Sequence, residues 1–350
     1  MSQTSPNNKS HGKEPTPEQI SHKQWRKALS PWLCLLLIWL VSNAVFFHAI
    51  RETPLSRNLW LIPQKWQIAD DLETTPDWLF LGDSSGNQGI DPVVASEQLG
   101  GNAVNLCLVA PAGSVGDAFM LDRVIKNVGP PKHVVLIHVF DFWVRDEPNL
   151  KTIPTPVWAA IGPDSPSPMP LDEKISLAGT QYFPAAGFNQ SFTKLLRDPA
   201  VLLRSPESKG LVIHPDGFMP MDPILPNTLE ADLAHHRAVC QDNTPKISKA
   251  NQRILERLLN QAIEHDFQIY LVNAPLVREA YTDPVIRPFY DRMNDELSAW
   301  AGQSDRVHHL LAEPALFGSE DIFNLDHTVG EAAQDYTRQV SEALLELQGK

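Results

Sequence analysis

Short apolar segments alternate with amphipathic helical segments over most of this 350-residue chain. The apolar segments have the length of buried strands, and turn-forming residues bound them. Because neighbouring parallel strands need a crossover between them, this alternation predicts a mostly parallel sheet with helices on both faces. The sequence therefore predicts an α/β fold with three layers, α/β/α, built around a five-stranded sheet.

The segment 248–265 illustrates the helical pattern, because its apolar residues recur on one face behind Ser248, a good N-cap. A β-rich run follows it directly. The predicted strands are 78–81, 103–109, 133–140, 268–273 and 307–311, and the predicted helices lie near 92–99, 114–127, 248–265, 288–301 and 330–347.

The run 31–50 contains no charged residue. About twenty apolar residues are enough to cross the ~30 Å hydrocarbon core of a bilayer. Lys23, Arg26 and Lys27 precede the run, and basic residues are sparser after it. This bias predicts a single-pass protein of the inner (cytoplasmic) membrane, with its N-terminus in the cytoplasm and the following domain periplasmic or extracellular. A signal peptide cleaved near 42–44 and a buried helix of a soluble domain are the alternatives.

Composition divides the chain into four parts. These are a disordered cytoplasmic tail (1–28), a transmembrane anchor in contact with the lipid bilayer (29–50), a juxtamembrane linker (51–76) and an α/β domain (77–350). Prolines crowd the segment 151–228, which excludes long helices and central strands there. This segment is an insertion that either shapes a ligand site or forms a surface excursion.

Charge and cysteine content narrow the function further. The formal net charge of −13 argues against a nucleic-acid partner. No pair of cysteines has the spacing of a zinc or redox site, and no metal or cofactor is predicted. Cys107 and Cys240 are either buried free thiols or a disulfide formed in an oxidising compartment. His235, His236 and Cys240 share a helical spacing, which we interpret as a polar helix face rather than a metal site.

One serine stands where functional groups gather in a parallel α/β sheet. Ser84, in FLGDSSGNQGIDP, directly follows the first predicted strand. A serine nucleophile needs an imidazole to take its proton and N–H groups to hold the oxyanion. His327, in the loop before the last predicted helix, is the candidate base. The other polar candidates are interpreted as structural: Ser85 (turn neighbour), His138 (core histidine), and His214 and Asp216 (a turn rather than a second catalytic pair).

Three segments resemble the conserved blocks of the SGNH/GDSL hydrolase-like superfamily, especially its membrane-anchored bacterial members. FLGDSSGNQGIDP is similar to the first block, whose serine is the nucleophile and matches Ser84. NLDHTVGEAAQDYT is similar to the last block, whose histidine is the general base and matches His327. AVNLCLVAPAGSVGD is similar to the second block, whose oxyanion-binding glycine corresponds to Gly113, with Ala110 as the alternative position.

The resemblance implies an SGNH-type fold and a serine esterase or O-acyltransferase. The implied substrates are acyl esters of a cell-surface polysaccharide or related glycan, or a small ester, and the implied partner is a multi-spanning membrane acyltransferase. Ser84 would attack the ester, His327 would act as base, Asn324 or Asp326 would orient His327, and the N–H groups of Ser84 and Gly113 would bind the oxyanion.

Two departures from the superfamily pattern leave a second function open. The last block usually reads Asp-x-x-His, but Asn324 stands three residues before His327, and Asp326 and Asp321 are the nearest acids. The Gly-x-Asn-Asp of the third block is replaced by IHVFDFW, in which only Asp141 remains. The alternative is a catalytically impaired SGNH-fold component of an envelope assembly complex that binds a glycan or a partner protein.

Overall fold

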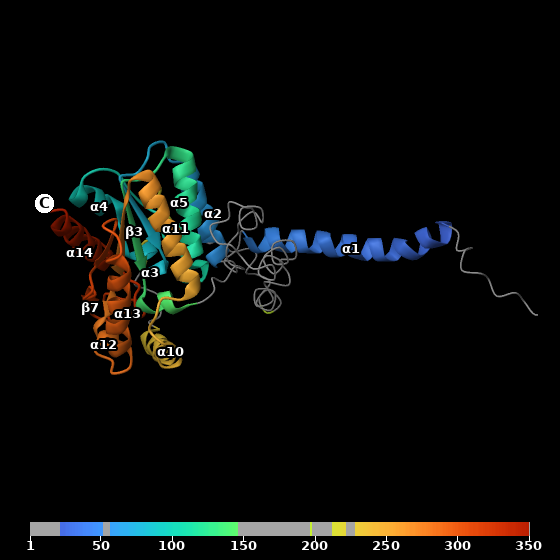
Figure 1. Cartoon of the computed structure of the whole chain (residues 1–350). Coiled ribbons are helices and arrows are strands. Elements are labelled where there is room, and N and C mark those ends of the chain that lie inside the picture. The colour runs from blue at the N-terminus through green and yellow to red at the C-terminus, as the bar shows by residue number, and fades with distance from the viewer. Residues whose placement is uncertain (1–21, 52–56, 146–196, 198–211, 222–227, 350) are drawn as a thin grey trace, which may run out of the picture.

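The computed structural model describes residues 22–51, 57–145, 197, 212–221 and 228–349 (Figure 1). Its core is a parallel sheet of five strands in the order β2-β1-β3-β4-β6. The strands are β1 (Trp78–Gly82), β2 (Ala103–Asn105), β3 (His133–His138), β4 (Gln268–Asn273) and β6 (Val307–Leu310). The predicted α/β class and the parallel five-stranded sheet are thus confirmed.

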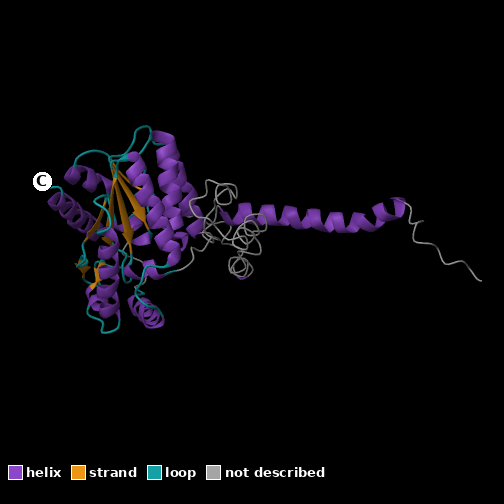
Figure 2. Ribbon diagram, viewed as in Figure 1, coloured by secondary structure: helices purple, strands orange, loops and turns teal. Residues whose placement is uncertain are grey.

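Helices cover both faces of this sheet (Figure 2). On one face α5 packs between α2 and α11, and on the other α14 packs on α3 and α4. Two short strands, β5 (Leu276–Val277) and β7 (Leu316–Phe317), form a separate parallel pair. The helices are α1 (His22–Arg51), α2 (Arg57–Asp70), α3 (Ser84–Gly89), α4 (Pro92–Leu99), α5 (Gly113–Val128), α10 (Leu229–Asp242), α11 (Lys249–His265), α12 (Arg278–Tyr281), α13 (Ile286–Ala301) and α14 (Ala332–Leu347), with 3-10 turns η3 (Ala110–Ala112) and η4 (Phe140–Val144).

Most predicted elements are present, and their bounds differ most at the carboxyl ends of two strands. β2 ends at Asn105 rather than at residue 109, and β3 ends at His138 rather than at 140. In both places the chain leaves the sheet and soon forms a 3-10 turn. The apolar residues after each strand are largely buried, and the Leu106 and Leu108 amides still donate to β1 carbonyls, so hydrophobicity alone does not mark where a strand ends.

Among the described residues, four helices lie where no helix was predicted. α2 occupies part of the predicted juxtamembrane linker, and α3 and α12 are only six and four residues long. α10 directly follows the Pro-rich insertion. Of the insertion (151–228), residue 197, residues 212–221 and residue 228 are described, so the predictions for the rest fall outside the described residues. Cys107 and Cys240 are buried free thiols rather than a disulfide.

Helix α1 contains the whole apolar run 31–50. Its first residue, His22, falls inside the segment that was predicted to be a disordered tail, and residues 1–21 lie outside the described ranges. Among the residues that the structure describes, no helix has both the length and the apolar character that crossing a bilayer requires. The transmembrane anchor therefore stays a prediction.

The turn after β1 depends on a glycine. Gly82 has a φ of +144°, and a Cβ built on it would lie 2.0 Å from the carbonyl oxygen of Ile137 on the neighbouring strand β3. A side chain at this position would therefore collide with backbone and not with a movable side chain. Close packing of β1 on β3 sets where the chain leaves the sheet.

We predict that Gly82→Ala lowers the free energy of unfolding by at least about 3 kcal/mol, because strain and a backbone collision combine. Gly100→Ala is the matched control: Gly100 has a φ of +71° but nothing lies within 4 Å of its Cβ position. That variant should lose only the conformational strain, about 1–2 kcal/mol. Urea unfolding of both variants measures the difference, and equal losses would contradict the collision.

Candidate active site

Ser84 is the first residue of α3, at the carboxyl end of β1. Asp83 precedes it as the N-cap, and its Oδ1 accepts a hydrogen bond of 2.9 Å from the Ser85 amide. Capping of this kind satisfies an amide that the first turn of a helix leaves without a partner. The Ser84 side chain is half-buried, and within the described residues its hydroxyl makes no hydrogen bond.

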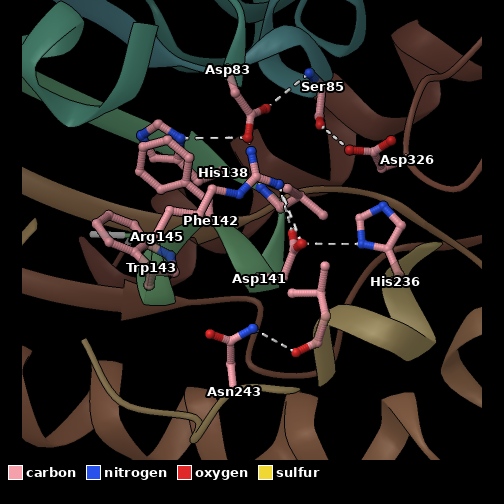
Figure 3. Close-up of polar contacts among 12 residues, drawn as sticks. Asp83, Ser85, His138, Asp141, Phe142, Trp143, Arg145, His236, Asn243 and Asp326 are labelled. Carbon is pink, nitrogen blue, oxygen red and sulfur yellow. Dashed lines mark hydrogen bonds and ion pairs between the residues drawn. The ribbon is translucent and has the colours of Figure 1, made fainter. Parts of the chain in front are cut away.

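Asp83 also anchors the end of β3 through a buried network (Figure 3). Its Oδ2 accepts a 3.0 Å hydrogen bond from the Val139 amide and lies 3.5 Å from Nδ1 of His138. The other ring nitrogen, Nε2, lies 2.8 Å from Oδ2 of Asp117, and the ring of Phe142 stacks on the imidazole. The interpretation of His138 as a hydrogen-bonded core histidine is confirmed.

This network keeps an imidazolium inside the protein. Burial opposes charge on His138, but the Asp117 and Asp83 carboxylates outweigh it and raise the pKa of His138 to about 9. For Asp83, burial favours the neutral acid, yet its contacts with His138 and two backbone amides hold its pKa below the ordinary value. The turn that carries Ser84 thus packs on a buried, charged network of Asp83, His138 and Asp117.

His327 is held by two oxygen atoms on the same side of its ring. Nδ1 lies 2.8 Å from Oδ1 of Asn324 and 3.0 Å from Oδ1 of Asp326. Since a carboxylate can only accept a hydrogen bond, Nδ1 carries the proton of the neutral ring and Nε2 is left with the lone pair. Among the described contacts, Nε2 has no hydrogen-bond partner. That arrangement suits a general base.

A tight turn lets both candidate partners reach the ring. Oδ1 of Asn324 also accepts hydrogen bonds from the amides of Asp326 and His327, at 3.2 and 3.1 Å. This bends the loop sharply enough to bring the adjacent Asp326 back to the imidazole. Burial opposes protonation of His327, but the Asp326 carboxylate outweighs it and raises the pKa of His327. Asp321 makes no side-chain contact with His327 among these interactions.

The two predicted catalytic segments meet through the residues beside Ser84 and His327. The buried Ser85 hydroxyl donates a 2.6 Å hydrogen bond to Oδ2 of Asp326 (Figure 3). The other carboxylate oxygen of Asp326 lies 3.0 Å from Nδ1 of His327. Ser84 and His327 are each one residue away from this bond. Ser85 is therefore more than the turn neighbour that the sequence predicted. No hydrogen bond joins the Ser84 hydroxyl to the His327 ring in this part of the chain.

The predicted oxyanion donors differ in their availability. The amide of Ser84, at the first position of α3, has no acceptor among the described backbone contacts. The amide of Gly113 already donates to the carbonyl oxygen of Ala110. The amide of Ala110, the alternative position weighed from the sequence, has no acceptor among the described contacts. Availability therefore favours Ala110 over Gly113 as the second backbone donor.

A second Asp–His pair, which the sequence did not indicate, lies near this site. His236 on α10 is buried, and its Nδ1 lies 3.3 Å from Oδ2 of Asp141 in η4. Both oxygens of Asp141 lie 3.2 Å from Nη2 of Arg145. His236 is thus not on a polar, solvated helix face. The spacing of His235, His236 and Cys240 had drawn attention to α10, but nothing in the sequence placed Asp141 beside it.

The described end of the insertion packs against α3. His214 and Asp216 form a turn: the Gly217 amide donates to the His214 carbonyl, and the Phe218 amide donates to the Asp216 side chain. The interpretation of these residues as a turn is confirmed. Next to them, the Met219 amide donates to the Asn87 carbonyl of α3 at 3.3 Å.

A buried lysine on α2 makes hydrogen bonds to the turn at Gly217 and to the end of β2. Nζ of Lys65, on α2, donates to the carbonyl oxygens of Asn105 (2.8 Å) and Gly217 (2.5 Å). The Asn105 side chain in turn donates to the carbonyls of Gly86 and Ile90, at 2.9 and 2.8 Å. Burial lowers the pKa of Lys65 to about 7.

Within the described residues, no group of three or more acidic, histidine or cysteine side chains has the arrangement of a metal site. Searches with the whole chain found no protein-family model that matches it and no curated protein that matches it.

The buried imidazolium of His138 predicts a pH-dependent stability. His138 titrates near 6.5 when unfolded and near 9 when folded. Its stabilising contribution is complete below pH 6.5 and is lost as the pH rises through about 9. The total is on the order of 3 kcal/mol. Lys65 has the opposite sign in this range, because its folded pKa is lowered.

The test is therefore the difference between wild type and His138→Gln, in which the Lys65 contribution cancels. The free energies of unfolding, measured in urea at pH 6 and pH 9.5, should differ more between the two proteins at pH 6. The same difference at both pH values would rule out a charged His138.

Proposed function

We propose that this protein is a serine esterase or O-acyltransferase of the SGNH type, with Ser84 as nucleophile and His327 as base. The observation that supports it best is the 2.6 Å hydrogen bond between Ser85 and Asp326, which joins the residue after Ser84 to the residue before His327. Triads are recognised by geometry and roles, and here a free serine hydroxyl and an imidazole with a free Nε2 belong to adjoining turns.

The proposed reaction proceeds by acyl transfer through Ser84. The Oγ of Ser84 attacks the ester carbonyl as Nε2 of His327 takes its proton. The tetrahedral oxyanion then collapses, the alkoxide leaves with the proton from His327, and the acyl group stays on Ser84. Water or a sugar hydroxyl, deprotonated by His327, attacks the acyl-enzyme and releases Ser84. Asn324 and Asp326 keep His327 in the tautomer that this sequence of steps needs.

The proposed substrate follows from the resemblance. Membrane-anchored relatives in the superfamily act on acylated cell-surface glycans, so we propose an acyl ester of a polysaccharide or related glycan. A multi-spanning acyltransferase is the proposed partner. The alternative is a binding component without catalysis. The amide of Gly113, which donates to Ala110, and the absence of a hydrogen bond from Ser84 to His327 within the described contacts favour that alternative.

We predict that Ser84→Ala abolishes covalent labelling by a fluorophosphonate and lowers p-nitrophenyl acetate hydrolysis at least about 100-fold, because the nucleophile is lost. Ser85→Ala is the matched control, one residue away. It removes the hydrogen bond to Asp326 but keeps the nucleophile, so it should react more slowly and still be labelled.

The site of labelling is read by mass spectrometry of the digested protein. Equal hydrolysis by wild type and Ser84→Ala, with no label on either folded protein, would favour the binding component.

We also propose that α1 anchors the protein in the inner membrane. Its large apolar side chains from Trp32 to Val41 are exposed, and a continuous exposed apolar surface marks an interaction with lipid or protein. The basic residues before it favour a cytoplasmic N-terminus and a periplasmic or extracellular site.

The anchor is tested in the full chain with the triple substitution Leu36→Arg, Ile38→Arg and Leu40→Arg. Each arginine near the middle of a membrane helix costs about 2.5–3.5 kcal/mol on insertion scales. The variant should leave the carbonate-resistant membrane fraction of expressing bacteria. Val93→Arg, at an exposed apolar residue of α4, should fractionate as wild type does. A triple variant that stays in the membrane fraction would contradict the anchor.

A further inference from the structure

The Asp141–His236 pair has one atom whose role the proposed reaction leaves open. Nδ1 of His236 lies 3.3 Å from Oδ2 of Asp141, an ion-pair contact without the geometry of a hydrogen bond. Within the described residues Nε2 makes no hydrogen bond, and the His236 side chain is only 10% exposed. Nη2 of Arg145 donates to both oxygens of the same Asp141 carboxylate.

His236 lies on the same side of the molecule as the catalytic loop. Helix α10 follows Thr228, whose amide donates to the Phe323 carbonyl, one residue before Asn324. One turn before His236 on α10, Asp232 is close enough to raise the pKa of His327. In Figure 3 the ring of His236 points its second nitrogen away from Asp141, toward the side where Asp326 is drawn. The ring of Phe140 supports it, with centroids 5.8 Å apart.

The charges around His236 favour the imidazolium. Burial alone would lower the pKa of His236, but Asp141 and then Asp326 outweigh it and raise it, while Arg145 works against them. On α10 itself, the ring of His235 lies 5.4 Å from that of His236, and Cys240 is one turn away. In the protonated ring both nitrogens donate, so Nε2–H is a charged donor directed away from Asp141.

The proposed reaction needs a donor of this kind. A tetrahedral oxyanion is stabilised by preorganised donors aimed at the charge that develops, and each is worth about 10²–10³ in kcat. Here the Gly113 amide already donates a hydrogen bond to the Ala110 carbonyl. The amides of Ser84 and Ala110 remain. A positively charged donor would add to the oxyanion stabilisation that these two backbone amides supply.

We propose that His236, held by Asp141, is a third oxyanion donor, with its Nε2–H directed at the oxygen of the substrate carbonyl. This inference rests on the proposed function, since it concerns the same acyl-transfer site. It assigns Asp141 as the positioning residue that orients His236 and keeps it charged. It also assigns α10, the helix that follows the insertion, a direct part in catalysis.

The test compares two amide substitutions in the full-length protein. His236→Gln places an amide nitrogen at about the position of the imidazole Nε2, whereas His236→Asn places one near Nδ1 and keeps only the contact with Asp141. We expect His236→Asn to lower kcat for p-nitrophenyl acetate about 100-fold with little change in KM, and His236→Gln to retain much more activity.

The pH profile gives a second readout that a structural role would not change. His327 must be neutral, so activity falls as the pH drops through its pKa. His236 must be protonated, so activity also falls as the pH rises through its pKa. The two pKa values are macroscopic and their assignment needs a variant. His236→Gln should remove the alkaline limb and leave the acid limb.

The outcomes separate this inference from the proposed function. Labelling that depends on Ser84, together with His236→Asn as active as wild type or more active than His236→Gln, overturns the role of His236 alone. Labelling and hydrolysis that do not depend on Ser84 overturn both. If His236→Asn fails to fold, as judged by its urea unfolding curve, the alkaline limb of His236→Gln decides: a limb that persists overturns the inference.

Discussion

The site depends on a buried hydrogen bond between residues 241 positions apart, from the Ser85 hydroxyl to the Asp326 carboxylate. It joins the loop before α14 to the first turn of α3, and the Thr328 hydroxyl adds a second buried bond, to the Gln88 carbonyl. Burial makes the contact matter, because an unpaired carboxylate oxygen there would carry a large desolvation cost. Because Ser85 follows Ser84 and Asp326 precedes His327, this hydrogen bond brings the turns that carry Ser84 and His327 together.

Buried pairs of an aspartate and a histidine recur at the carboxyl edge of the sheet. The turn after β1, the 3-10 turn after β3 and the loop before α14 each contain an aspartate paired with a histidine: Asp83 with His138, Asp141 with His236, and Asp326 with His327. In each pair burial opposes ionisation, and the partner charge overcomes it. The three pairs differ in the partner of the second ring nitrogen of the histidine. His138 has a second carboxylate, Asp117, whereas His236 and His327 each keep an Nε2 without a partner among the described residues.

The sheet was predictable because each strand is marked by a short run of apolar residues in its own segment of the sequence. The strand 268–273 and the helix 92–99 were predicted with the bounds observed, since turn residues mark both ends. Ser84 and His327 were singled out from short motifs at a strand end and before the last helix. The contacts of Ser85 and His236 could not be predicted, because their partners, Asp326 and Asp141, come from other segments. An Asx turn at Asn324 decides whether Asp326 reaches the ring, and only the backbone of that turn reveals it.

The buried amino group of Lys65 links segments that are far apart in the sequence. It ties α2 to Asn105, and Asn105 holds the carbonyls of Gly86 and Ile90 at the end of the helix that Ser84 begins. Tension applied at the N-terminal side of α2 would thus pass into β2 and α3 through hydrogen bonds in the interior. The position of Ser84 is coupled in this way to that of α2.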